Sequence, residues 1–371
     1  MTSDTSSTLF VSPESQFDLR SVAKLFAKMA VLQLDKEGTL SLEDSLGTYL
    51  PGFPHGSEIT VQHLMEHSSG LPREFNDSIR NTLSLTPEEV VALAALEPLE
   101  FDPGTREQYS NVGFQLLYYL IGEVTGGSFS GYLYEHVFGP LGMGATGDNF
   151  DPDQGHRTHY AYGHYLDRDN VLQTVQSFPP DDMKMGNLYS TVDDLDQFLT
   201  SLDPGLYPSL VHQGSISHAG GTRGKRAYLE RNFEAGYTLI FLANFDDIPF
   251  EMLVSDLQKL MTGQGVTMPE RVQRQAVRVA PEILKRYEGT YDFAEAGHLL
   301  LTIKLERDSL WVYQKGQNNG VLYPENERVF FGDPASRESL EFAPDGSGGF
   351  YILMDFQGVR WKGVRVSPAE E

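Results

Sequence analysis

The chain has 371 residues, 40% of them hydrophobic, a formal net charge of −24 and no cysteine. The acidic charge argues against binding to nucleic acid or to an anionic membrane, because phosphate groups carry the same sign. The lack of cysteine excludes disulfides, thiol catalysis and thiolate metal sites, and no apolar run approaches the ~18 residues that a membrane-spanning helix needs. Residues 1–16 lack the pattern of a secretory signal peptide, so a cytoplasmic location is expected.

The first two thirds of the chain alternate between helix and turn signals. Residues 20–34 combine strong helix formers with apolar side chains around most of the circumference, which predicts a buried helix with Ser21 in its first turn. Further helices are predicted after Thr86 and over residues 111–124, 191–202 and 249–261. Three short strands are predicted over residues 215–218, 226–231 and 237–243.

The last third of the chain is rich in strand signals. Strands are predicted over residues 299–303, 309–313, 329–331 and 350–354, separated by turns such as Asn-Gly and Asp-Gly. This pattern indicates a small antiparallel barrel or sandwich. The predicted organisation is therefore a first domain over residues 1–261, a linker over 262–282 and a β domain over 283–371.

Ser21 and Lys24 form the only Ser-x-x-Lys pair in the chain. Residues three apart share a helix face, so the hydroxyl and the amine would meet. A serine hydroxyl becomes a nucleophile when a base accepts its proton, and a desolvated lysine can be that base. The pair points to covalent acyl transfer, although a lone motif of this kind is a weak signal.

Two further segments strengthen that signal: Tyr109-Ser110-Asn111, which leads into an apolar helix, and His218-Ala219-Gly220-Gly221, which opens the first β region. With them the chain resembles the serine β-lactamase and penicillin-binding-protein superfamily, in its esterase and D-peptidase branch. That family uses Ser-x-x-Lys, Tyr-x-Asn and Lys/His-x-Gly elements in this order. Connecting segments at residues 59–72, 138–143 and 188–191 also look like the family's, so the resemblance covers roughly residues 9–260.

The resemblance implies a role for each matching residue. Ser21 would attack a carbonyl carbon, Lys24 would take its proton, and Tyr109 would relay a proton to the leaving group. Asn111 would orient Lys24 and the substrate, and His218 would stand beside the substrate's polar end. The N–H groups of Ser21 and Gly221 would form the oxyanion hole, and Gly220 would let the strand approach the substrate closely.

The resemblance also implies an α+β fold, in which helices pack on an antiparallel sheet and a small lipocalin-like barrel follows. Relatives carry a helix and two strands before the Ser-x-x-Lys motif, whereas only 20 residues precede Ser21 here. The sheet is therefore expected to lack its N-terminal strands, and its exposed edge makes a homodimer a candidate assembly. Arg20 also departs from the family, because a small residue commonly precedes the serine.

His63 and His67 are one helical turn apart, a spacing that can bind zinc. No third ligand with suitable spacing follows, and a structural role is favoured. His156, His159 and His164 cluster in a loop-like region and are expected to form a solvated loop near the rim of the site. No metal and no cofactor is expected.

The predicted function is hydrolysis of an ester or amide through an acyl-enzyme on Ser21. The substrates expected are small molecules or short peptides: small esters, D-amino-acid-type peptides or β-lactam-like compounds. Two alternatives remain open: a catalytically silent scaffold or binding protein, and an acyltransferase that uses a small alcohol or amine in place of water. The barrel could bind a small apolar ligand, although side chains that simply fill its interior are favoured.

Overall fold

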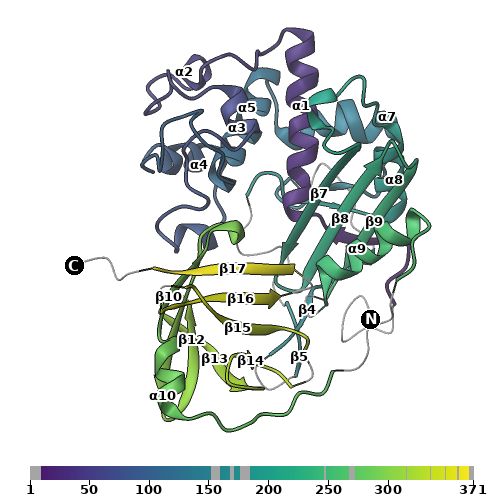
Figure 1. Ribbon diagram of the computed structural model, residues 1–371. Coiled ribbons are helices and arrows are strands. Elements are labelled where there is room, and N and C mark those ends of the chain that lie inside the picture. Colours follow the sequence, from purple (N-terminus) through teal and green to yellow (C-terminus); the bar gives the residue numbers. More distant parts are fainter. Residues whose placement is uncertain are drawn as a thin grey trace. The chain divides into compact units, whose positions relative to one another are not determined.

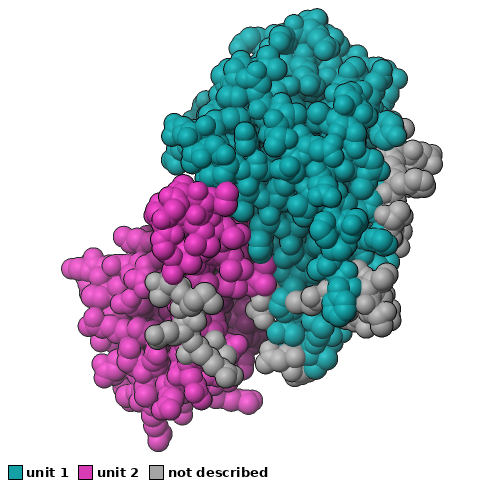
Figure 2. All heavy atoms as spheres, turned by 90° about the vertical axis from the view of Figure 1, so that its right-hand side faces the viewer, with its two compact units in different colours: residues 1–247 teal, residues 248–371 magenta. Residues whose placement is uncertain are grey.

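The structure is a computed structural model that describes residues 10–151, 159–167, 171–175, 184–245, 248–266, 272–314, 316–334, 336–346, 348–356 and 359–366. The chain forms two compact units, residues 1–247 and 248–371, which Figure 2 shows in different colours. The helix expected over residues 249–261 therefore groups with the second unit, and the domain boundary after residue 261 stays a prediction. Of the helices in the described ranges, none combines the length and the apolar character that crossing a bilayer requires.

The first unit is built around a long buried helix, α1 (Figure 1). Phe26 of this helix is fully buried, stacks on Phe198 with ring centroids 4.1 Å apart and meets Phe138 edge-on at 5.8 Å. The helix ends at Gly38, whose φ of +74° closes it in the left-handed conformation that glycine adopts without strain. The helices of this unit are α1 (Ala23–Glu37), α2 (Leu46–Tyr49), α3 (Val61–Met65), α4 (Pro87–Ala94), α5 (Asn111–Thr125), α6 (Phe129–Leu133), α7 (Gly139–Leu141) and α8 (Val192–Ser201), with shorter helical turns at η1 (Arg20–Val22), η2 (Arg80–Thr82), η3 (Tyr134–Phe138) and η5 (Pro208–Leu210).

The helix predicted over residues 20–34 is confirmed, with a difference at its start. Residues 20–22 form the 3₁₀ turn η1, and the α-helix begins only at Ala23. Arg20 has a φ of +50°, a left-handed value that is uncommon for a residue with a side chain. Ser21 therefore lies in a tight turn before the α-helix and not in its first turn.

An antiparallel sheet of three strands follows α8. It consists of β7 (Ser215–Thr222), β8 (Lys225–Asn232) and β9 (Tyr237–Ala243), in that order. This arrangement confirms the expected α+β fold, and in the described residues this sheet has three strands. The first strand is longer than predicted, because it continues through both glycines of the His-x-Gly element to Thr222.

The sequence did not predict a second sheet, which contains the first strand of the chain. Its centre is β1 (Ser15–Asp18), and its order is β2 (Gly147–Asp148), β6 (Leu188–Ser190), β1 and β3 (His159–Tyr160). Strand β1 runs parallel to β3 and antiparallel to β6. A separate two-stranded sheet joins β4 (His164–Leu166) and β5 (Leu172–Thr174).

The buried carboxylate of Asp18 fixes the end of β1. It accepts hydrogen bonds from Asn149 at 2.8 Å and from the hydroxyl of Tyr160 at 2.6 Å, and it pairs with Lys225 of β8. Burial alone would raise its pKa, but the Lys225 ammonium and these hydrogen bonds hold the pKa below its usual value. The ion pair therefore ties the strand before Ser21 to the three-stranded sheet.

The second unit contains a closed antiparallel barrel of eight strands, which confirms the predicted small barrel. Tyr287 and Phe342 stack inside it with ring centroids 4.1 Å apart. Part of the predicted linker runs along this barrel, since the N–H groups of Arg274 and Val277 donate to main-chain oxygens of Pro334 and Pro324, each at 2.8 Å. The elements of the unit are α9 (Phe250–Met261), α10 (Pro281–Leu284), η6 (Lys285–Tyr287), β10 (Gly289–Phe293), η7 (Ala294–Ala296), β11 (Leu299–Glu306), β12 (Ser309–Gln314), β13 (Gln317–Pro324), β14 (Val329–Phe331), β15 (Ser339–Pro344), β16 (Phe350–Phe356) and β17 (Val359–Val366).

Candidate active site

The turn that holds Ser21 is fixed by the strands on both sides of it. The N–H of Leu19 donates to the main-chain oxygen of Leu188 in β6 at 2.8 Å. On the other side, β7 passes so closely that a Cβ on Gly220 would lie 2.1 Å from the oxygen of Leu19. Only glycine permits this approach, so Gly220 sets the distance between β7 and the turn.

Two side chains converge on the hydroxyl of Ser21. The Nζ of Lys24 lies 3.3 Å from Ser21 Oγ, and the hydroxyl of Tyr109 donates to the same oxygen at 2.9 Å. Lys24 comes from the first turn of α1, whereas Tyr109 comes from the loop before α5. Residues 88 positions apart therefore meet at one oxygen.

Asn111 opens α5 and joins the cluster through its amide group. Its Oδ1 accepts from Lys24 at 2.7 Å, and its Nδ2 donates to Glu74 at 2.5 Å. Its N–H donates to the main-chain oxygen of Arg73 at 2.9 Å. The preceding Ser110 caps the helix by accepting from the N–H of Gly113 at 2.9 Å. These contacts hold the amide in one orientation, with its oxygen toward Lys24.

Burial changes the acid–base chemistry of the cluster. It lowers the pKa of Lys24 to about 7, against the carboxylate of Glu74, which favours the ammonium form. The positive charges of Arg73, Arg20 and Lys28 lower this pKa further. A substantial share of the Lys24 side chains is therefore neutral near pH 7 and can accept a proton. Burial raises the pKa of Tyr109, so its hydroxyl keeps its proton in the same range.

His67 packs against Tyr109, one of the residues that contact Ser21. Its ring stacks on Tyr109 with centroids 4.5 Å apart and lies 4.7 Å from the ring of Phe114. Its Nδ1 accepts the N–H of Ser110 at 3.1 Å. Burial and the nearby charges of Lys28 and Lys24 lower its pKa to about 3, so the ring is neutral. His67 therefore packs against Tyr109 as an uncharged aromatic side chain.

The two histidines with zinc-like spacing do not share a helix face. Helix α3 ends at Met65, and His67 has a φ of +58° beyond that end. His63 lies within α3 and completes a capping box, in which its Nδ1 accepts the N–H of Thr60. No group of three His, Asp or Glu side chains that could hold a metal occurs in the described part of the chain.

The three histidines predicted to cluster in a loop, His156, His159 and His164, do not form one described cluster. His159 belongs to β3 and His164 to β4, which lie in different sheets. The Nδ1 of His164 lies 3.2 Å from the hydroxyl of Thr174 in β5. His156 falls outside the described residues.

His218 and Gly221 lie on β7, the strand that passes the turn of Ser21. The half-buried His218 ring contacts the main-chain oxygen of Ala219 at 2.8 Å. Desolvation lowers its pKa to about 4, and Lys24 and Lys28 contribute to this shift, so the ring is neutral at pH 7. Gly221 lines the same cavity as Ser21, which is compatible with the predicted oxyanion hole.

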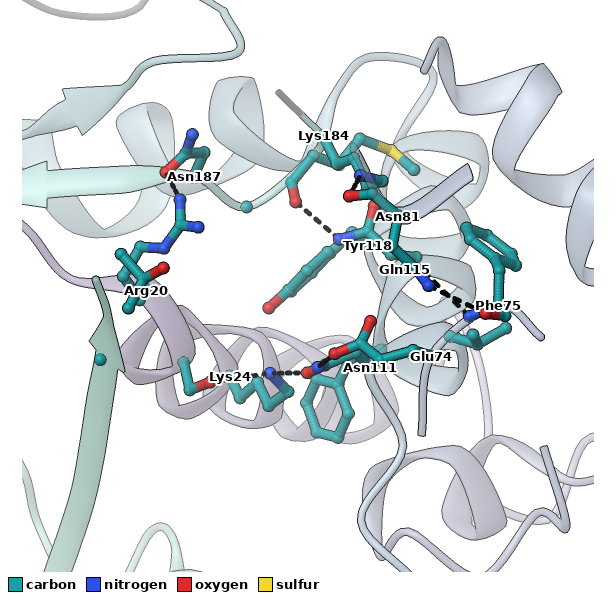
Figure 3. A pocket seen from close by; sticks show the side chains of 17 residues that line it. Arg20, Lys24, Glu74, Phe75, Asn81, Asn111, Gln115, Tyr118, Lys184 and Asn187 are labelled. Atoms are coloured by element: carbon teal, nitrogen blue, oxygen red, sulfur yellow. Dashed lines mark hydrogen bonds between the residues drawn. The ribbon is translucent and has the colours of Figure 1, made fainter. Parts of the chain in front are cut away.

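A cavity of about 440 Å³ opens in front of Ser21 (Figure 3). Lys24, Asn111 and Glu74 are linked along one wall, and Arg20 reaches Asn187 on another, with 3.4 Å between Arg20 Nη1 and Asn187 Oδ1. The described lining includes neither Tyr109 nor His218, although Tyr109 contacts the nucleophile directly. The cavity has the volume of a small-molecule site.

Sequence reasoning missed several residues of this cavity. Glu74, Lys184 and Asn187 lie outside the motifs named from the sequence, and they reach the cavity only through the fold. Arg20 was visible as a departure from the family pattern, but its place in the cavity wall was not. Their adjacency to the Ser-x-x-Lys and Tyr-x-Asn elements in space is the only signal that identifies them.

The profile of the Beta-lactamase family matches residues 2–237, more than half of the chain. The chain belongs to this family. Its members are typically serine hydrolases, in agreement with the cluster around Ser21. A penicillin-binding protein of Bacillus subtilis (strain 168) is 26% identical over 371 aligned positions, which cover 85% of this chain and 80% of that protein.

Two solved structures illustrate how far the family fold extends along the chain. An octameric penicillin-binding protein homologue from Pyrococcus abyssi is similar over 98% of this chain and 91% of its own, with a TM-score of 0.63 and 23% identity. The D-amino acid amidase from Ochrobactrum anthropi SV3, solved with L-phenylalanine amide, covers 66% of this chain and 81% of its own, with a TM-score of 0.57 and 20% identity. At such identities the likeness shows the fold alone, and the likeness to the first structure extends over nearly the whole chain.

Proposed function

We propose that this Beta-lactamase family member hydrolyses an ester or amide through an acyl-enzyme on Ser21. The observation that supports this most directly is the double contact of Ser21 Oγ with Lys24 and Tyr109. A lysine with a pKa of about 7 can act as a base near neutral pH, where an ordinary lysine is almost entirely protonated.

In the first half of the reaction, Ser21 Oγ bonds to the carbonyl carbon and its proton passes to Nζ of neutral Lys24. The oxyanion forms beside the N–H groups of Ser21 and Gly221. The intermediate then collapses, the bond to the leaving group breaks, and Tyr109 donates a proton to that group. Tyr109 is reprotonated from the Lys24 ammonium. The Ser21 proton has therefore left with the leaving group, and Lys24 and Tyr109 return to their starting protonation states. In this proposal the neutral ring of His218 contacts the polar end of the substrate.

In the second half a water molecule takes the place of the leaving group. Lys24 accepts a proton from this water, whose oxygen bonds to the acyl carbon. The bond to Ser21 Oγ breaks, and the Lys24 ammonium returns its proton to that oxygen. Asn111 keeps Lys24 oriented in both halves through its 2.7 Å contact.

The substrates that fit the proposal are small esters, D-amino-acid-type amides and β-lactam-like compounds. The cavity volume of about 440 Å³ suits a molecule of this size. The structural likeness to a D-amino acid amidase makes amides of D-amino acids a good first panel. Gly220 brings β7 against the nucleophile, and an extended substrate could pair with this strand.

Labelling with a fluorophosphonate serine probe tests the proposal. The wild-type chain should be labelled, and Ser21→Ala should not. The matched control is Ser57→Ala, which alters an exposed serine that does not line the cavity at Ser21 and should be labelled as wild type. A folded wild-type protein that resists the probe would instead support the silent scaffold.

An acyltransferase is the second candidate, because the same acyl-enzyme could react with an alcohol or amine. Adding methanol or hydroxylamine at constant substrate should then raise turnover and produce the acylated acceptor. A strict hydrolase would release only the free acid.

We also propose that the chain self-associates through its three-stranded sheet. In the described residues β9 pairs with β8 alone, and the Pyrococcus abyssi homologue is octameric. A strand edge that no other described strand covers can pair with a second copy. Light scattering should give a mass of at least two 41.4 kDa chains. A monomer at micromolar concentration would contradict this proposal.

A further inference from the structure

Helix α5 carries a polar stripe along the wall of the cavity at Ser21. Asn111, Gln115 and Tyr118 have the spacing i, i+4 and i+7, so they share one face of the helix, and all three line the cavity. Asn111 belongs to the cluster around Ser21 through its contact with Lys24. The reaction proposed above uses only this first residue of the stripe, so it leaves Gln115 and Tyr118 without a role.

The two remaining side chains of the stripe differ in their contacts. The Nε2 of Gln115 donates to the main-chain oxygen of Met185 at 2.9 Å, which ties α5 to a second wall of the cavity. Among the described residues, the hydroxyl of Tyr118 has no hydrogen-bond partner, although the side chain is only 3% exposed. Figure 3 shows this hydroxyl pointing into the cavity. Buried tyrosine hydroxyls usually find a partner, and here the cavity is where that partner can enter.

The ring of Tyr118 is held firmly in place. It stacks on Phe129 with centroids 4.6 Å apart and meets Phe114 edge-on at 6.2 Å. Main chain also packs against it, since Gly186 has a φ of +76° and a Cβ at this position would lie 2.5 Å from a ring carbon of Tyr118. Only glycine permits a contact that close. The hydroxyl therefore reaches the cavity in one fixed orientation.

The cavity is the place for the acyl part of the substrate. In the reaction proposed above Tyr109 protonates the leaving group, and Tyr109 is not among the described residues that line the cavity. The acyl part is attached to the same carbonyl carbon, and from Ser21 it can extend along the polar stripe of α5. Burial raises the pKa of Tyr118 well above its ordinary value, so the hydroxyl keeps its proton and can donate it in a hydrogen bond.

We propose that Tyr118 determines specificity by donating a hydrogen bond to a second carbonyl oxygen in the acyl part of the substrate. The proposal rests on the function proposed for Ser21, because that function assigns the acyl part to the cavity. A peptide or an N-acylated amino acid has such an oxygen, and a simple alkyl ester does not. A wholly apolar acyl chain would displace water from the hydroxyl and leave a buried donor unpaired, which disfavours its binding.

The first experiment measures binding in the absence of catalysis. Ser21→Ala cannot be acylated, so calorimetry gives the affinity of its ligands directly. The ligands are the p-nitroanilides of 5-oxohexanoic acid and 5-methylhexanoic acid, which have the same length and branching and differ only by a ketone oxygen in place of a methyl group. The same comparison is made with one methylene fewer and with one more, because the length of the chain decides where the oxygen lies.

Tyr118→Phe, added to Ser21→Ala, removes the hydroxyl and keeps the ring that stacks on Phe129. In at least one of the three pairs it should lower the ratio of the oxo affinity to the methyl affinity at least fivefold. The matched control is Tyr119→Phe, which removes a hydroxyl from the next residue of α5, outside the described lining of the cavity, and should leave the ratio within twofold. Circular dichroism checks that each variant is folded. Equal ratios in the two folded variants for all three pairs overturn the proposal, and so does a lack of measurable binding by every ligand.

The second experiment separates this proposal from the reaction at Ser21. The chain with Ser21 intact is assayed with the p-nitrophenyl esters of the same acids, and Tyr118→Phe should lower the ratio of kcat/KM values by the same factor as the ratio of affinities. If no ester is cleaved while the affinity ratio depends on Tyr118, the reaction proposed for Ser21 is wrong and the contact with Tyr118 stands. If the esters are cleaved and neither ratio responds to Tyr118→Phe, the reaction stands and the role of Tyr118 is refuted.

Discussion

The pKa of Lys24 should set the pH at which Ser21 is acylated, and two neighbouring charges should move it in opposite directions. With a pKa of about 7, the neutral fraction rises from roughly one tenth at pH 6 to roughly nine tenths at pH 8. Glu74→Gln removes a negative charge that favours the ammonium, so the pKa should fall. Lys28→Gln removes a positive charge that disfavours the ammonium, so the pKa should rise.

The size of both shifts follows from the geometry. Lys28 lies one helical turn from Lys24, and Glu74 lies across a single amide group from it. Two charges about 6 Å apart interact by roughly 0.7–2.8 kcal/mol for an effective dielectric between 80 and 20, or about 0.5–2 pKa units. Glutamine at position 74 can still accept the hydrogen bond from Asn111, so the orientation of the amide should survive.

The assay is kcat/KM for a chromogenic ester between pH 5 and 9, which reports the pKa values of the free enzyme. The acid limb should have its midpoint near pH 7 in the wild type, lower in Glu74→Gln and higher in Lys28→Gln. His67 and His218 titrate near 3 and 4, outside this window. Midpoints that stay fixed, or that move in the same direction in both variants, would refute Lys24 as the base.

Three further predictions concern single contacts. Tyr109→Phe removes the second donor to the nucleophile and should lower the acylation rate by ~10²-fold or more without changing the melting temperature, as stopped-flow acylation beside a melt will show. Gly220→Ala should lower the melting temperature by several degrees and abolish activity, because its Cβ would lie 2.1 Å from the main-chain oxygen of Leu19. Gly221→Ala, whose Cβ would meet the Arg226 side chain at 3.2 Å and the main-chain oxygen of Lys225 at 3.3 Å, should lower it less. Lys225→Met leaves the buried Asp18 without its ion partner and should cost about 3–5 kcal/mol in urea unfolding at pH 7; a loss below 1 kcal/mol would mean that the pair is not buried in solution.

The sequence predicted the members of the site better than their surroundings. Ser21 and Lys24 were identifiable because residues three apart meet in a helical turn, here a 3₁₀ turn that leads into α1. Tyr109 and Asn111 were identifiable because they form a recognisable element before an apolar helix. Glu74 was not identifiable, because its contact with Asn111 joins two segments that are 37 positions apart in the sequence and meet only in the folded chain. A short-range pattern carries no information on such a contact.

The fold shows the same division between local and long-range information. Helix α1 was predicted to within three residues at each end, since its composition and length are characteristic. Strand β1 was missed, because all four of its residues are buried and show none of the alternation that marks a half-exposed strand. Its neighbours β2, β3 and β6 are two or three residues long, too short to give a signal of their own.

The pairing of β1 has a consequence for how the protein is made. Ser21 leaves the ribosome before β6 and β7 do, yet the turn that holds it rests on β6 and on Gly220 of β7. The nucleophile therefore stays unpositioned until some two hundred further residues have been synthesised. Contacts of such long sequence separation slow folding, so the site should be completed late, after α1 and α5 have formed. A nascent chain that ends before β7 would carry both Ser21 and Lys24 and still be inert toward a serine probe.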